Sequence, residues 1–127
     1  MRKSALIGSI VALLLGSAPA PAGPWEDGMV AYNRGDYVPA IRLFRPLAEA
    51  GNSKAQAQIG LMYRKGEGTA QSPARAFMWF SLAAKRGDAK AKAELRAVSG
   101  TMTPAEISQA RAMAGACEAS NYRNCEY

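Results

Sequence analysis

Apolar residues recur along most of the chain at the three- and four-residue spacing that places them on one face of an α-helix. In the segment 37–50, for example, apolar residues stand at 40, 41, 44, 47 and 48, and Arg42, Arg45 and Glu49 fall between them. This pattern, read together with proline, glycine and capping residues, predicts helices over residues 25–33, 37–50, 53–65, 73–86, 89–98 and 104–116. We therefore expect an all-α fold.

The expected helix ends carry recognisable stop and start signals. Gly51 can adopt the left-handed backbone that ends a helix, and Asn52 can cap the next one. Gly35 and Asp36 offer the same pair of signals earlier in the chain, and Gly87 and Asp88 offer it later. The stretch from Thr103 to Glu106 has the pattern of a capping box at the start of the last expected helix. Pro46 lies inside the expected helix over 37–50, where it removes one backbone hydrogen bond and should either bend the helix or loosen it locally.

Two stretches of the chain repeat each other at an offset of 36 residues. The positions that return are Ala40, Phe44, Ala48, Gly51, Lys54 and Ala55, which are matched by Ala76, Phe80, Ala84, Gly87, Lys90 and Ala91. A period of this length is typical of solenoids built from helix pairs. The sequence thus predicts an α/α helical-repeat solenoid of about two and a half helix pairs, closed by a C-terminal capping helix, and such folds usually present a binding surface.

The second helix pair resembles the Sel1-like repeat, a relative of the tetratricopeptide repeat. The resemblance rests on the run from Ala55 to Tyr63, the Gly-Glu-Gly turn that follows, and the aromatic helix after it. The matching structural positions are Gly60, Tyr63, Gly66, Gly68, Ala76, Trp79, Ala83, Ala84 and Gly87. The resemblance implies an interaction or adaptor protein without catalytic activity, and it does not identify a ligand.

The resemblance also implies a candidate binding face, because tetratricopeptide-like geometry puts the first helix of each pair on the concave side. The side chains expected there are Asp27, Arg34, Lys54, Gln58, Leu61, Arg64 and Lys65. Together they form a mildly basic face in this prediction. The alternative is that they are ordinary solvated side chains. The partner is an unknown protein or peptide, and the short groove suits either a peptide segment or a second copy of the chain.

The first 22 residues resemble an export signal rather than part of the fold. Arg2 and Lys3 provide a basic start, residues 5–15 form an apolar run, and Ala20-Pro21-Ala22 offers small residues for cleavage after Ala22. The apolar run is too short to span a membrane, which takes about 20 residues, so no stable membrane insertion is expected after cleavage. We therefore expect a periplasmic or secreted protein divided into residues 1–22 as signal peptide, 23–116 as repeat domain and 117–127 as C-terminal tail.

The charge of the chain limits the classes of partner it can be expected to bind, and its two cysteines indicate an oxidising compartment. Without Arg2 and Lys3, the 16 basic residues fall to 14 against 10 acidic ones, and the basic groups are scattered, so nucleic acid is not an expected partner. Cys117 and Cys125, the two cysteines, lie after the expected last helix. In an exported chain they predict a disulfide, worth roughly 2–3 kcal/mol for so small a loop. A redox or metal role is the weaker alternative.

Catalysis finds little support in the sequence. The chain has no histidine, no GxSxG motif and no phosphate-binding loop, so we expect no enzyme, no metal site and no cofactor. Glycosidases use only carboxylates, which keeps a lytic or cell-wall-binding protein as the alternative function. However, Glu26 and Asp27 stand on successive helix positions and Glu67 in a turn, so none of these carboxylates is expected in the apolar surroundings of a catalytic acid. A peripheral membrane binder is also disfavoured, because most aromatic residues fall on the core-facing stripes of the expected helices.

Overall fold

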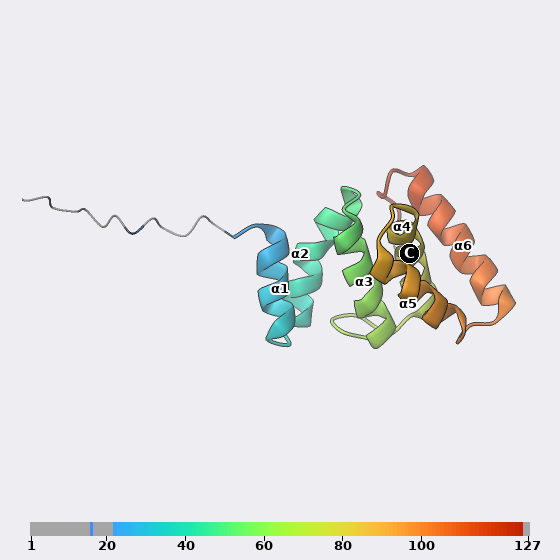
Figure 1. The fold of residues 1–127 in the computed structure, drawn as a ribbon, viewed down its shortest axis with the longest axis horizontal. Helices are drawn as coiled ribbons and strands as arrows, with labels where there is room; N and C mark the ends of the chain where they lie inside the picture. Colours follow the sequence, from blue (N-terminus) through green and yellow to red (C-terminus); the bar gives the residue numbers. More distant parts are fainter. Residues whose placement is uncertain (1–15, 17–21, 126–127) are drawn as a thin grey trace, which may run out of the picture.

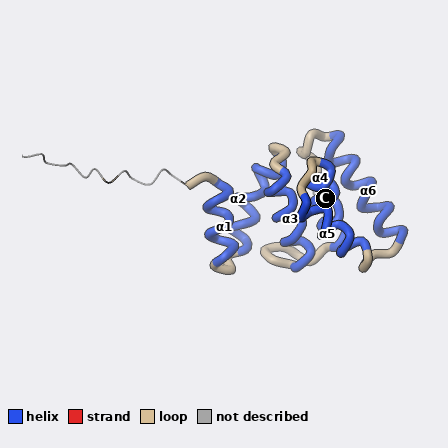
Figure 2. The backbone as a smooth tube through the Cα atoms, viewed as in Figure 1, coloured by secondary structure: helices blue, strands red, loops and turns tan. Residues whose placement is uncertain are grey.

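The structure is a computed structural model that describes residue 16 and residues 22–125. The described part is all-α, as predicted, and forms a row of helices that follow one another across the molecule (Figures 1 and 2). The helices are α1 (Pro24–Asn33), α2 (Tyr37–Glu49), α3 (Ser53–Lys65), α4 (Pro73–Lys85), α5 (Ala89–Ser99) and α6 (Pro104–Ala119). The predicted signal peptide lies outside the described residues except for Gly16 and Ala22.

Consecutive helices pack against each other, and α4 occupies the centre of the core. It contacts α3, α5 and α6, whereas α1 packs mainly on α2. Trp79 and Phe80 of α4 are completely buried, together with Phe44 of α2 and Tyr63 and Ile59 of α3. The helix with the fully buried Trp79 and Phe80 therefore lies at the centre of the core.

Side-chain caps begin most of the helices where the sequence predicted them. Asn52 Oδ1 accepts a hydrogen bond from Ala55 N at 3.0 Å, and Asp88 Oδ1 accepts one from Ala91 N at 2.8 Å. Thr103 and Glu106 form the predicted capping box at the start of α6. The prediction was wrong for Asp36, which precedes α2 but accepts no capping hydrogen bond. Its ψ of 69° departs from the extended backbone that brings an N-cap oxygen to the first turn.

The interior proline does not interrupt α2. Tyr37–Glu49 is one continuous α-helix with Pro46 inside it, and Ala50 N still donates to the Pro46 carbonyl at 3.0 Å. Pro46 itself is exposed. Whether Pro46 bends α2 or loosens it locally, it does not end the helix.

A glycine in the first helix of each pair allows the second helix to approach closely. A Cβ built on Gly28 would stand 2.5 Å from the Phe44 ring, and one built on Gly60 would stand 2.7 Å from the Phe80 ring. Phe44 and Phe80 are the residues related by the 36-residue offset. Gly60 is one of the motif positions recognised in the sequence. Gly28 makes the same contact in the first pair but was not recognised there.

We expect Gly60→Ala to destabilise the protein relative to Gly115→Ala by about 1–3 kcal/mol. Both glycines lie inside helices, so both substitutions gain similar helix propensity. The difference between the unfolding free energies of the two variants therefore reports the steric clash. The new methyl group at position 60 meets the buried Phe80 ring, and the one at position 115 meets no atom within 4 Å. Urea unfolding of the two variants measures it, and equal midpoints would contradict the close packing.

The C-terminal helix is longer than predicted. α6 continues to Ala119, so Cys117 belongs to the helix and not to a tail that follows it. The reason is burial, because Cys117 is fully buried and extends the inward stripe of Ile107, Ala110 and Ala114 by one more turn. Cys117 forms the predicted disulfide with Cys125, which is also buried.

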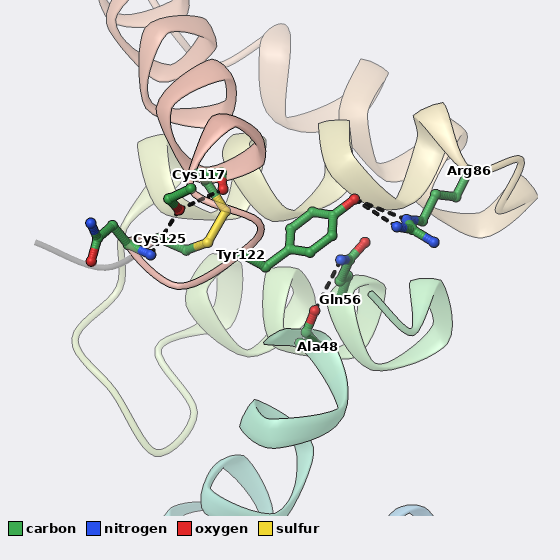
Figure 3. Close-up of a disulfide and its surroundings, with 8 residues drawn as sticks. Ala48, Gln56, Arg86, Cys117, Tyr122 and Cys125 are labelled. Carbon is green, nitrogen blue, oxygen red and sulfur yellow. Dashed lines mark hydrogen bonds between the residues drawn. A yellow bond between two sulfur atoms is a disulfide. The ribbon is translucent and has the colours of Figure 1, made fainter. Parts of the chain in front are cut away.

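The disulfide returns the last described residues across the end of α4 (Figure 3). Tyr122 lies between the disulfide and Arg86, whose Nε and Nη2 donate to the Tyr122 hydroxyl at 3.0 and 2.8 Å. Below the Tyr122 ring, Gln56 of α3 donates from Nε2 to the Ala48 carbonyl at 3.0 Å. The hydrogen bonds from Arg86 thereby link the C-terminal segment to the end of α4.

Candidate functional site

The first helices of the pairs, α1, α3 and α5, line a cleft of about 270 Å³, called here the amino-end cleft. It opens near the start of α1, α3 and α5. Its lining residues are Trp25, Met29, Lys54, Ala57, Gln58, Asp88 and Lys90. Lys54, Ala57 and Gln58 of α3 stand three and four residues apart, so their side chains lie on one face of the helix, and this face lines the cleft.

The amino-end cleft combines an apolar wall with two cationic groups. Trp25 and Met29 are half-buried, and Lys54 and Lys90 are exposed. Lys54 Nζ lies 5.2 Å from the centre of the Trp25 ring, within the range of a cation–π contact. The carboxylate of Asp88 is the acidic group of the lining, and it is already engaged as the cap of α5.

A second cleft of about 390 Å³, the carboxyl-end cleft, lies between the other ends of α3 and α5. Its lining residues are Arg64, Gln71, Pro73, Ala97, Val98 and Thr101. Its polar groups bond within the protein: Gln71 Nε2 donates to the Arg64 carbonyl at 2.8 Å, and Thr101 Oγ1 donates to the Val98 carbonyl at 2.7 Å. Arg64 Nε also lies 3.0 Å from Glu94 Oε2, so this cation is neutralised by an ion pair.

The predicted concave residues divide among different surroundings. Lys54 and Gln58 line the amino-end cleft, and Arg64 lines the carboxyl-end cleft. Gln58 and Leu61 are each only 7% exposed. The expectation that both side chains are presented to a partner was therefore wrong, because their face of α3 packs toward neighbouring helices.

The remaining predicted residues, Asp27, Arg34 and Lys65, are exposed and line neither cleft. Asp27 and Arg34 stand seven residues apart, at the start of α1 and just after its end, and so share an outward stripe. Lys65 Nζ is 3.9 Å from Glu67 Oε1. The structure therefore does not gather these seven residues into one face. It places Lys54 in the same cleft as Lys90, which was not among the residues expected at the binding face.

The residues of the repeat motif have structural surroundings. Gly60, Tyr63, Ala76, Trp79 and Ala83 are buried in the core. Ala84 is half-buried and Gly87, with φ of 95°, ends the turn after α4. The loop glycines, Gly66 and Gly68, have φ of 71° and 75°. None of these residues lines either cleft, so the motif holds the scaffold and leaves recognition to other positions.

The loop between α3 and α4 connects the first helix pair to the second through Glu67. Tyr32 of α1 donates its hydroxyl hydrogen to Glu67 Oε1 at 3.0 Å. The loop passes close to α2, because a Cβ on Gly68 would lie 2.7 Å from the Tyr37 carbonyl oxygen. Burial and the Glu67 carboxylate raise the pKa of Tyr32 to about 12, with the nearby Gln58 amide acting in the opposite direction. The Glu67 carboxylate also raises the pKa of Tyr37.

The raised pKa of Tyr32 predicts a loss of stability at alkaline pH. The neutral phenol is favoured in the folded state, so its stabilisation is complete below pH 10, the ordinary pKa of tyrosine, and disappears as the pH rises through about 12. We expect Tyr32→Phe to lower the free energy of unfolding near neutral pH by about 1–2 kcal/mol, and this deficit to shrink above pH 10.

Urea unfolding of both proteins at a series of pH values measures the Tyr32 effect. Tyr122→Phe is the matched control, because it also removes a hydrogen-bonded tyrosine hydroxyl, but one that accepts from Arg86 and has no hydrogen bond to Glu67. A wild-type advantage over Tyr32→Phe that stays constant from pH 9 to 12 would rule out the assigned coupling.

Two further kinds of site are absent from the residues that the structure describes. No group of three or more His, Cys, Asp or Glu side chains there could hold a metal ion. None of the described helices has the length and apolar character needed to cross a membrane. The described surface contains the two clefts defined above.

The comparison with protein families agrees with the resemblance read from the sequence. Residues 53–88 match the family model of the Sel1 repeat. These residues comprise α3, the Glu67 loop, α4 and the turn before α5. No curated protein matches the chain. Sel1 repeats are typically modules for protein–protein interaction and are generally non-catalytic.

Proposed function

We propose, from the premise that this chain is a Sel1-like repeat protein, that it acts outside the cytoplasm as a non-catalytic module that binds another protein or a peptide segment of one. The observation that carries the proposal is the separation of roles in the helix pairs. The family motif is used for packing, while the first helices α1, α3 and α5 present clefts lined by residues outside that motif. The protein partner is of unknown identity.

Export is part of this proposal and has two supports. One is the basic, apolar and small-residue order of residues 1–22. The other is the disulfide between Cys117 and Cys125, since disulfides persist in oxidising compartments. Sequencing the amino terminus of the protein recovered from its host tests it. We expect a chain beginning at Gly23, and a chain retaining Met1 in the cytoplasmic fraction would contradict export.

Photocrosslinking tests the binding function at defined positions of the surface. A crosslinking amino acid replaces Lys54, in the amino-end cleft, or Val38, which is 48% exposed on α2 and serves as the matched control. After irradiation in the host cell, mass spectrometry of the adducts should identify a protein partner at position 54 that is absent at position 38. Adducts absent at position 54, or identical at both positions, would contradict a partner bound on the side of the first helices.

A further inference from the structure

The amino-end cleft carries a further inference, which rests on the proposed binding function and specifies the ligand chemistry. We propose that this cleft binds a peptide segment in which an acidic side chain stands next to an apolar one. The apolar side chain packs on Trp25 and Met29, and the carboxylate pairs with Lys54 and Lys90.

The charges around the cleft favour an anionic group. Lys54 and Lys90 come from different helix pairs and converge on one cleft, and each is exposed. Asp88 does not neutralise them fully, because one carboxylate faces two ammonium groups and already accepts the Ala91 amide hydrogen at 2.8 Å. The carboxyl-end cleft differs in this respect, since its Arg64 is paired with Glu94. Charge complementarity therefore selects the amino-end cleft for an acidic ligand.

The apolar wall specifies the second half of the ligand. Trp25 packs on the buried Phe44 ring, with ring centres 5.1 Å apart, and this contact holds one side of the indole in place. Lys54 Nζ lies over the Trp25 ring, so the cation and the apolar surface are adjacent. An acidic residue next to an apolar residue in the ligand would place complementary groups on both.

The size of the cleft favours a peptide over a cofactor-sized molecule. Its volume of about 270 Å³ is below the range of about 300–1,000 Å³ typical of small-molecule pockets. It can hold one bulky side chain while the backbone of the ligand stays at the rim. The half-buried position of Trp25 and Met29 also suits a side chain better than a flat lipid surface.

Selection from a random heptapeptide display library tests the ligand chemistry. The bait is the disulfide-bonded protein beginning at Gly23, and its counterpart is the double variant Lys54→Glu, Lys90→Glu. The matched control is Lys92→Glu, Arg96→Glu, which reverses two exposed charges of α5 outside the cleft. Thermal unfolding of all three checks that the exposed substitutions leave the fold intact.

We expect the wild-type protein to select peptides with Asp or Glu beside an aromatic or aliphatic residue. The selected peptides should bind the cleft variant at least tenfold more weakly and the control variant within about threefold, and their affinity should fall with added salt. Selected peptides without acidic residues, equal loss in both variants, or no selected peptide would overturn the proposal. Binding of anionic vesicles or nucleic acid in place of peptides would overturn it too.

The two proposals fail differently in these experiments. If peptides or crosslinked partners bind but the Lys54 and Lys90 reversal has no effect, the interaction module stands and the cleft assignment is wrong. If position 54 also gives no crosslinked protein in cells, the proposed function fails with it.

Discussion

Replacing Trp79 by alanine should lower the free energy of unfolding by about 3–5 kcal/mol, the largest effect we expect from one substitution. Trp79 is 0% exposed, and it lies on α4, the helix that contacts α3, α5 and α6. Removal of the indole leaves a cavity among all of these helices, which cannot all move in to fill it. For a small domain this is a large share of a total stability of about 5–15 kcal/mol.

Urea unfolding followed by circular dichroism measures the Trp79 effect. Val38→Ala provides the control, because it also truncates an apolar side chain but at an exposed site, and it should change stability by less than about 0.5 kcal/mol. If Trp79→Ala were no more destabilising than Val38→Ala, α4 would not be the centre of the core.

Reducing the disulfide should lower the free energy of unfolding by about 2–3 kcal/mol. The expected loss comes from the unfolded chain, which gains freedom when the loop from Cys117 to Cys125 opens. A further contribution is expected in the folded state, because the disulfide holds Tyr122 against Arg86 and over Gln56 (Figure 3). Reduction should therefore destabilise α3 and α4 as well as α6, and the loss in free energy of unfolding should be larger than fraying of α6 alone would cause.

Two measurements check the disulfide prediction. Thiol titration of the denatured, unreduced protein should find no free thiol, and two thiols would show that the bond does not form. Urea unfolding with and without reductant gives the stability difference, and equal midpoints would mean that the bond contributes nothing. Tyr122→Phe separates the two contributions, because it removes the hydrogen bonds from Arg86 and leaves the disulfide intact.

The local signals of the sequence predicted most of the fold. Asn52, Asp88 and the Thr103 capping box begin their helices in the structure as expected, because a cap depends on residues within one turn of itself. The errors arose where distant contacts decide. Cys117 was assigned to a tail, although burial against the core keeps it in α6. Gly28 went unnoticed because its meaning depends on Phe44, which lies on another helix.

The candidate site was less predictable than the fold. The resemblance to tetratricopeptide-like repeats grouped Lys54 with Asp27 and Arg34 on one face, whereas in the structure Lys54 lines a cleft and the other two residues line neither cleft. Lys90 was recognised only as the repeat counterpart of Lys54. Its place across the cleft from α1 depends on how α5 is set against the two preceding helix pairs, and a helical pattern contains no such information.

The sequence by itself determined the repeat type, the number of helices, most of their caps and the cysteine pair, since each follows from periodicity or from neighbours along the chain. Only the tertiary structure decided which charges are free to meet a ligand. Arg64 forms an ion pair with Glu94 of α5, and Glu67 accepts a hydrogen bond from Tyr32 of α1. Lys54 lines the same cleft as Lys90 and Trp25. These partners lie about thirty or more residues apart in the sequence, and the strength of a charge interaction depends on the distance through space, which only the packing of the helices sets.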